Sequence, residues 1–132
     1  MTVSLYTTDT AGAYSLIEMI HPPNVGPALH VHPRGPESFF IIDGSYTFVR
    51  GSDTITLVAG QAISIPAGTP HRYTVGSTGG RAIVICPPDL EHYFLSVAEL
   101  LKHGALPIAE EFDIASRYGQ NFLDSSAHWG VT

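Results

Sequence analysis

The residues best suited to do chemistry gather between His30 and Gly44. His30 and His32 are two positions apart, and alternate residues of a β-strand point to the same face, so both imidazoles can aim at one point. Glu37 begins an apolar run, where a carboxylate needs a cationic partner. Two imidazoles and one carboxylate from adjacent strands form a ligand set typical of open metal sites such as those of non-haem iron.

A further ligand is expected downstream, at His71. An extended run ends at Pro66-Ala-Gly68, which is a turn composition, and the chain re-enters extended structure at His71. The sequence therefore predicts one divalent ion bound by His30, His32, Glu37 and His71. The ion would be Fe, Mn, Ni, Cu or Zn, because the order of ligand affinities does not choose among them.

Both stretches resemble the paired motifs of the cupin superfamily. The first motif runs from a glycine through His-x-His and Glu to a second glycine, and this sequence supplies His30, His32, Glu37 and Gly44, with Asn24 in place of the leading glycine. The second runs from a glycine through Pro-x-Gly and His to an asparagine, and is met by Gly60, Pro66, Gly68 and His71, with Val75 in place of the asparagine. The resemblance implies that the three histidines and the glutamate are metal ligands.

Short apolar runs separated by turn compositions indicate an all-β fold. The runs are rich in β-branched and aromatic residues, and no helical periodicity separates them before residue 88. Strands are predicted at Val3–Tyr6, Ala13–Ile20, 37–42, 45–50, 53–58, 61–65, 71–76 and 80–86. Closure of such antiparallel strands into a jelly-roll β-barrel, the fold that the resemblance also implies, would hide the strand edges.

The periodicity changes after Cys86, which predicts a barrel over residues 1–88 and a helical extension over 89–132. Asp89 is expected to cap a helix that ends at Gly104, with its apolar stripe at Leu90, Phe94, Val97 and Leu101. A second helix fits Pro107–Tyr118. We expect both helices to pack on the outside of the barrel, clear of the metal cavity, within a single domain of 132 residues.

Composition narrows the range of partners and locations. The net charge of −6 disfavours nucleic-acid binding, and the longest apolar runs are strand-sized, so no membrane span is expected. Charged residues make up only 14% of the chain, which is compatible with surface buried in a homodimer. The single cysteine, Cys86, and an N-terminus without signal-peptide character predict a cytoplasmic protein.

Strand parity suggests which other side chains face the metal. Tyr73 shares a face with His71, where its phenol could donate a hydrogen bond to substrate, although packing alone would equally explain it. Phe39 and Ile41 share a face with Glu37, which predicts an apolar cavity for a small apolar or aromatic substrate. The remaining histidines have simpler interpretations as loop, helix-end or surface residues: His21, His92, His103 and His128.

The resemblance implies more than one function. Likeness to bacterial quercetinase-like cupins implies a dioxygenase that cleaves an aromatic or β-dicarbonyl substrate, with Glu37 and Tyr73 as the catalytic candidates. Likeness to cupin-fold polyketide cyclases implies a non-redox cyclase or isomerase in which water on the metal serves as acid and base. A non-catalytic cupin that binds a small molecule is the third alternative.

Overall fold

The computed structural model describes residues 1–104 and 106–124, so His128 and the end of the predicted extension lie outside the described residues. Its strands are β1 (Thr2–Leu5), β2 (Ser15–His21), β3 (His30–Val31), β4 (Glu37–Arg50), β5 (Asp53–Val58), β6 (Ala62–Ile65), β7 (His71–Cys86) and β8 (Asn121–Phe122). Its helices are the 3₁₀-helix η1 (Thr7–Thr10), α1 (Leu90–Lys102) and α2 (Ile108–Arg117). The predicted all-β fold with two short helices near the C-terminus is confirmed.

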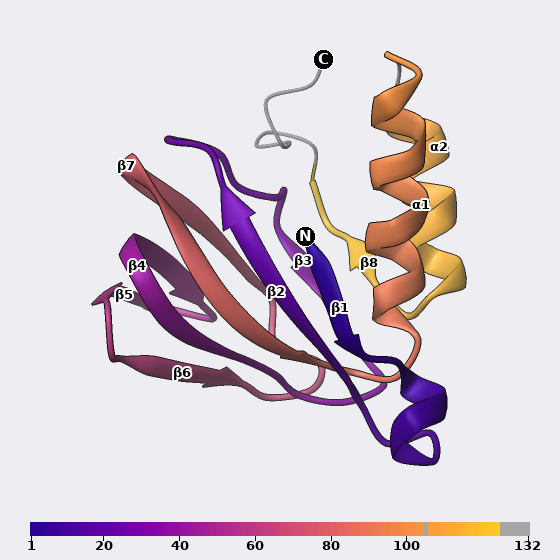
Figure 1. The fold of residues 1–132 in the computed structure, drawn as a ribbon, viewed down its shortest axis with the longest axis horizontal. Helices are drawn as coiled ribbons and strands as arrows, with labels where there is room; N and C mark the ends of the chain where they lie inside the picture. The colour runs from indigo at the N-terminus through magenta and orange to yellow at the C-terminus, as the bar shows by residue number, and fades with distance from the viewer. Residues whose placement is uncertain (105, 125–132) are drawn as a thin grey trace.

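Two long strands hold the antiparallel jelly roll together. The second half of β7 lies between β2 and the first half of β4, which also pairs with β6, while β1 extends this layer beyond β2. The first half of β7 lies between β3 and the second half of β4, which also pairs with β5, while β8 pairs with β3. Both layers are visible in Figure 1, where β4 and β7 curve from one into the other.

The predicted breaks within residues 37–50 and 71–86 are wrong. Strand β4 continues through Gly44, and β7 continues through the glycines of residues 76–80. Gly44 has a φ of +77° and Gly79 a φ of +78°, a conformation that glycine adopts at little cost. The β4–β7 register shifts on either side of this point, where Gly44 pairs with Gly80. Glycines that suggest a turn in the sequence therefore bend a continuous strand.

The predicted alternation of inward and outward residues is confirmed along the long strands. On β4, Phe39 and Ile41 are buried whereas Phe40 is 46% exposed. The inward side chains of both layers form one apolar core that includes Ile17, Phe39, Ile41, Tyr46, Phe48, Tyr73, Val75, Ala82 and Val84. Side chains of alternate residues thus point into the space between the layers, where the metal ligands were predicted.

Helix α1 begins where predicted, but Asp89 does not cap it. Asp89 has a φ of +73° and its side chain makes no capping hydrogen bond. Its carboxylate Oδ2 instead lies 3.3 Å from Nη1 of Arg34, and its backbone N–H donates to the Thr7 hydroxyl. The buried face of the helix also differs from the predicted stripe, since Tyr93 is buried and Leu101 is 38% exposed.

The segment after α2 is not helical as predicted. Asn121 and Phe122 form β8, which pairs with β3 so that Phe122 lies opposite His30. The extension therefore completes the edge of the layer that carries the predicted metal ligands. Among the described residues, no helix is long and apolar enough to cross a membrane.

We predict that Gly80→Ala destabilises the barrel by about 1–3 kcal/mol, the usual cost of overpacking a tight core. A Cβ added at Gly80 would lie 2.5 Å from Cε1 of the Tyr46 ring, which is itself fully buried. Gly35→Ala is the matched control, because its nearest contact would be an ordinary 3.7 Å to Pro87. Urea unfolding would measure both variants, and equal stabilities would contradict the prediction.

We further predict that Glu111 makes stability fall as pH rises. The Tyr93 hydroxyl of α1 donates to Oε1 of Glu111 in α2 at 3.0 Å, and burial raises the pKa of Glu111 from 4.5 to about 7. Between pH 4.5 and 7, Glu111 binds a proton in the folded protein more often than in the unfolded chain. The free energy of unfolding therefore falls as pH rises through this range. Glu111→Gln should therefore gain stability over the native protein at pH 8 and much less at pH 5.

Thermal unfolding across this pH range, with equal metal content in both proteins, would measure the difference. A stability difference between the variant and the native protein that does not change with pH would show that Glu111 titrates normally.

Candidate metal centre

The structure brings all four predicted ligands to one buried place. His30 lies on β3, His32 follows that strand, and Glu37 and His71 begin β4 and β7. One ligand atom from each residue lies within 4.8 Å of the others. The His30 ring centroid is 4.2 Å from that of His71 and 4.9 Å from that of His32. This cluster could hold a metal ion.

Backbone carbonyls fix the orientation of two of the rings. Nδ1 of His30 lies 2.7 Å from the Ala28 oxygen, and Nδ1 of His71 lies 2.9 Å from the Thr69 oxygen. Because a carbonyl can only accept, Nδ1 must carry the hydrogen in both rings. In the neutral rings, Nε2 then presents a lone pair to the cluster. A hydrogen bond of this kind is what orients metal-binding histidines in general.

The facing atoms of the cluster need a proton or a metal ion between them. Nε2 of His71 lies 3.2 Å from Oε1 of Glu37, and Nε2 of His32 lies 3.3 Å from the same oxygen. Either contact is a hydrogen bond only when the histidine nitrogen carries a hydrogen, and a ring that binds a metal through Nε2 carries none there. Within the described residues, neither ring nitrogen of His32 has a hydrogen-bond partner. A divalent ion would satisfy these buried acceptors together, so the donor set fits a metal.

Electrostatics favour the protonation states that bind metal. Burial opposes the charge on Glu37, but the nearby His32 and His71 outweigh it and hold the pKa of Glu37 below its usual range. Burial, followed by the neighbouring His71 and His32, lowers the pKa of His30 to about 3. At neutral pH the site therefore holds a carboxylate anion and a neutral His30 imidazole, which are the forms that ligate metals.

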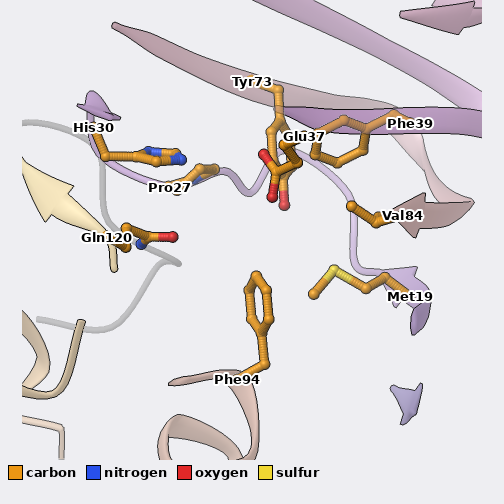
Figure 2. A pocket seen from close by; sticks show the side chains of 9 residues that line it. All are labelled: Met19, Pro27, His30, Glu37, Phe39, Tyr73, Val84, Phe94 and Gln120. Atoms are coloured by element: carbon orange, nitrogen blue, oxygen red, sulfur yellow. The ribbon is translucent and has the colours of Figure 1, made fainter. Parts of the chain in front are cut away.

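A small cavity opens beside the cluster (Figure 2). The cavity volume is about 10 Å³, which is room for about one water molecule and far below the usual range for drug-sized ligands. Five of its nine lining residues are apolar and four are polar. The lining residues are Met19, Pro27, His30, Glu37, Phe39, Tyr73, Val84, Phe94 and Gln120. The predicted positions of Phe39 and Tyr73 beside the ligands are confirmed, whereas Ile41 is buried in the core and does not line this cavity.

The expectation that the C-terminal extension stays clear of the cavity is wrong. Phe94 of α1 points into the space below Glu37 in Figure 2. Gln120, just before β8, also lines the cavity and is only 2% exposed. Phe94 belonged to the predicted apolar stripe of its helix, which indicated burial but not the surface it would cover. No sequence signal identified Gln120.

An apolar groove lies next to this cavity, between β2 and α1. Met19 and Phe94 line both spaces, so they form the wall between them. The groove offers about 250 Å³ and is open to solvent, and its other walls are mainly aliphatic: Ile20, Pro22, Val25, Val97, Ala98 and Leu101, together with Met1 and His21. A ligand larger than the inner cavity could therefore extend an apolar part towards α1.

The other described histidines are not part of the cluster. His103 is exposed directly after α1, and His92 lies near Asp89 and Glu91 in a second group that could hold a metal. The carboxylate of Glu91 is, however, already bonded to the backbone N–H and the hydroxyl of Thr7, at 2.8 and 2.9 Å. His21 is buried and hydrogen-bonded to tyrosines on both sides.

We predict that His71→Ala abolishes stoichiometric metal binding. Loss of a direct ligand should weaken affinity by more than the roughly 10–100-fold that loss of a supporting group costs. Metal per chain would be measured by elemental analysis after loading and desalting. His103→Ala is the control, because its side chain is 75% exposed and it should keep full metal content. Full metal content in the His71→Ala protein would refute the site.

Comparison with known proteins supports the fold and gives a distant enzyme relative. Quercetin 2,3-dioxygenase of Bacillus subtilis (strain 168) is 34% identical over 55 residues, which are 42% of this chain but only 16% of that relative. An uncharacterized conserved protein of Klebsiella pneumoniae with a double-stranded β-helix domain superposes with a TM-score of 0.56. That pair is 22% identical and covers 66% of this chain and 74% of the other.

Another similar structure is that of the DMSP lyase DddQ from Ruegeria pomeroyi DSS-3, which is 26% identical, with a TM-score of 0.52. The match covers 60% of this chain and 40% of the lyase. The family model for the cupin domain matches residues 17–88, from β2 to the end of β7 and beyond. Because that match spans more than half of the chain and includes all four clustered side chains, this protein belongs to the cupin family.

Proposed function

We propose that this cupin is a metal-dependent enzyme that acts on a small, largely apolar substrate with an aromatic or β-dicarbonyl oxygen function, as a dioxygenase of the quercetinase type. The observation that carries the proposal is the convergence of three imidazoles and the Glu37 carboxylate within 4.8 Å, beside a small cavity that His30 and Glu37 line together with apolar side chains. The partial similarity to a quercetin 2,3-dioxygenase supports the choice of reaction.

In the proposed enzyme, His30, His32, His71 and Glu37 hold the ion. A divalent ion held there would polarise a substrate oxygen and, if redox-active, would activate dioxygen. Three histidines and one glutamate leave room in a six-coordinate shell for a substrate oxygen. The surrounding side chains then determine which substrate oxygen binds and which group accepts its proton.

Glu37 is proposed to accept the proton of a substrate hydroxyl. A glutamate carboxylate, with an ordinary pKa of about 4.3, is an anion and a weak base at neutral pH. A weak base takes a proton readily only from an acidic hydroxyl. This favours enols and phenols over the alcohols of sugars. Tyr73, which lines the same cavity, is proposed to donate a hydrogen bond to a second substrate oxygen.

The shape of the site favours a flat apolar substrate. Phe39, Val84 and Met19 offer apolar surface near the ligands, and Phe94 lies between the inner cavity and the groove. The inner space of about 10 Å³ has room beside the ligands for a substrate oxygen and not for a whole ring. A remaining apolar portion would lie in the groove against α1, where few polar groups are available.

A non-redox reaction is the second candidate. The same donor set can polarise a carbonyl without any change of oxidation state, and the similarity to the fold of a DMSP lyase supports lyase-like chemistry on this scaffold. In this alternative, which includes cyclisation or isomerisation of polyketide-like substrates, Glu37 moves a proton between two atoms of the substrate. A purely binding role is the third candidate.

The proposal also includes a cytoplasmic location and a homodimer. The one cysteine, Cys86, is buried and free, which suits a reducing compartment such as the cytoplasm. Phe40 and Ile85 are exposed on the outer face of the sheet, 46% and 44% respectively, and would be covered in a homodimer.

We predict oxygen consumption by the purified chain when it is loaded with at least one of Fe, Mn, Co, Ni or Cu and mixed with quercetin or a β-diketone. An oxygen electrode and mass spectrometry of the product would follow the reaction. Zinc-loaded protein should consume none, because zinc has no redox chemistry. Glu37→Gln should lower turnover by at least about 100-fold, as is usual for loss of a general base, and metal content measured alongside would separate loss of the base from loss of the ion.

The outcomes separate the candidates. Absence of oxygen uptake with every metal would exclude the dioxygenase. Rearrangement or elimination of substrate without oxygen uptake, lost in Glu37→Gln, would establish the non-redox enzyme. Metal-dependent binding of the same compounds, with no product, would identify a binding protein.

A further inference from the structure

A buried chain of three side chains leads away from the metal cavity. The Tyr73 hydroxyl, in the cavity wall, lies 3.2 Å from Nε2 of His21. Nδ1 of His21 lies 2.7 Å from the hydroxyl of Tyr46. The residues come from β7, β2 and β4 respectively, and each is at most 7% exposed. Tyr73 therefore touches the cavity, whereas His21 and Tyr46 stand behind it.

The His21 ring is neutral, which fixes how many hydrogens the three hydrogen-bonded side chains share. Burial is the main cause that lowers the pKa of His21, to about 4. A neutral imidazole has one nitrogen that donates and one that accepts. One tyrosine must therefore donate to His21 and the other must accept from it. The tyrosine that accepts keeps its own hydroxyl hydrogen for a different acceptor.

The distances favour one of the two arrangements. Hydrogen bonds donated by a hydroxyl are typically shorter than those donated by a ring N–H. The 2.7 Å contact to Nδ1 fits donation by Tyr46, and the 3.2 Å contact fits Nε2–H donating to Tyr73. We infer that Tyr46 holds His21 in its Nε2–H tautomer, so that His21 donates to Tyr73 and the Tyr73 hydroxyl hydrogen is donated elsewhere than to His21.

Packing keeps this arrangement in place. The Tyr46 ring lies against Gly80, where even a Cβ would clash with it, and β2 pairs His21 with the same glycine. The His21 ring meets both tyrosine rings edge-on, at interplanar angles of 77° and 69°. Neither the imidazole nor the Tyr46 phenol can turn far without losing these contacts, so packing keeps the two hydrogen-bond distances in place.

For the site, the consequence concerns the Tyr73 hydroxyl, whose hydrogen is not donated to His21. Tyr73 lines the same cavity as Glu37, which is an anion. A Tyr73 hydroxyl that accepts from His21 can donate on the cavity side, to an oxygen of a bound molecule. His21 and Tyr46 are thus positioning residues that act through Tyr73. This role rests on the proposed function for the identity of the bound molecule, but the tautomer itself does not.

Nitrogen NMR of the full-length, zinc-loaded protein would test the tautomer, because zinc is diamagnetic and protonated and bare ring nitrogens resonate far apart. His21 should show a protonated Nε2 and a bare Nδ1. Tyr73→Phe should leave that tautomer unchanged, since Tyr46 still donates. Tyr46→Phe should shift the ring towards a mixture or towards the Nδ1–H form. Each variant removes a single oxygen, and amide spectra would verify that both remain folded.

A protonated Nδ1 in the native protein would overturn the inference without any variant. An unchanged tautomer in Tyr46→Phe would also overturn it, because Tyr46 would then not be the residue that sets the tautomer. The measurement needs neither substrate nor turnover, so failure of the proposed reaction would leave its result unaffected.

Discussion

The buried meeting of His30, His32, His71 and Glu37 is the constraint on which the rest of the site depends. Three imidazoles and a carboxylate share a place from which water is largely excluded, and in the form that binds a metal each presents a lone pair to the others. Such groups are costly to bury together unless a cation lies between them. Backbone carbonyls orient the rings of His30 and His71, and Glu37 faces the cavity as an anion. A bound ion would therefore stabilise the fold as well as serve the reaction.

Histidines in this barrel are oriented in two contrasting ways. At His30 and His71 the partner is a backbone carbonyl, which can only accept, so the ring keeps its bare nitrogen for the cluster. At His21 both partners are phenols, which can donate or accept, so the orientation depends on which phenol is closer. The backbone partners of His30 and His71 therefore fix the tautomer of those rings. The tautomer of His21 depends on side chains, so a single substitution can change it.

The sequence was most informative where chemistry and periodicity agreed. His-x-His spacing and strand parity predicted that the ligands, Phe39 and Tyr73 would gather, because a strand's alternation holds regardless of the rest of the fold. The continuity of β4 and β7 was missed because Gly44 and Gly79 can form a turn or bend a strand, and only partner strands decide which. Phe94 and Gln120 were missed as cavity residues because packing between distant segments places them, and no local pattern encodes that contact.

The length of β7 has a consequence for how the chain folds as it is synthesised. This strand pairs with β2, β3 and β4, and so belongs to both layers of the barrel. Until residues 71–86 leave the ribosome, the segments that precede them can form only the local hairpins of β1 with β2 and β4 with β5 and β6, with their other edges open. Contacts this distant in sequence form slowly, and open edges attract other chains. The nascent barrel therefore passes through a period of exposure to aggregation, which ends only when its last long strand arrives.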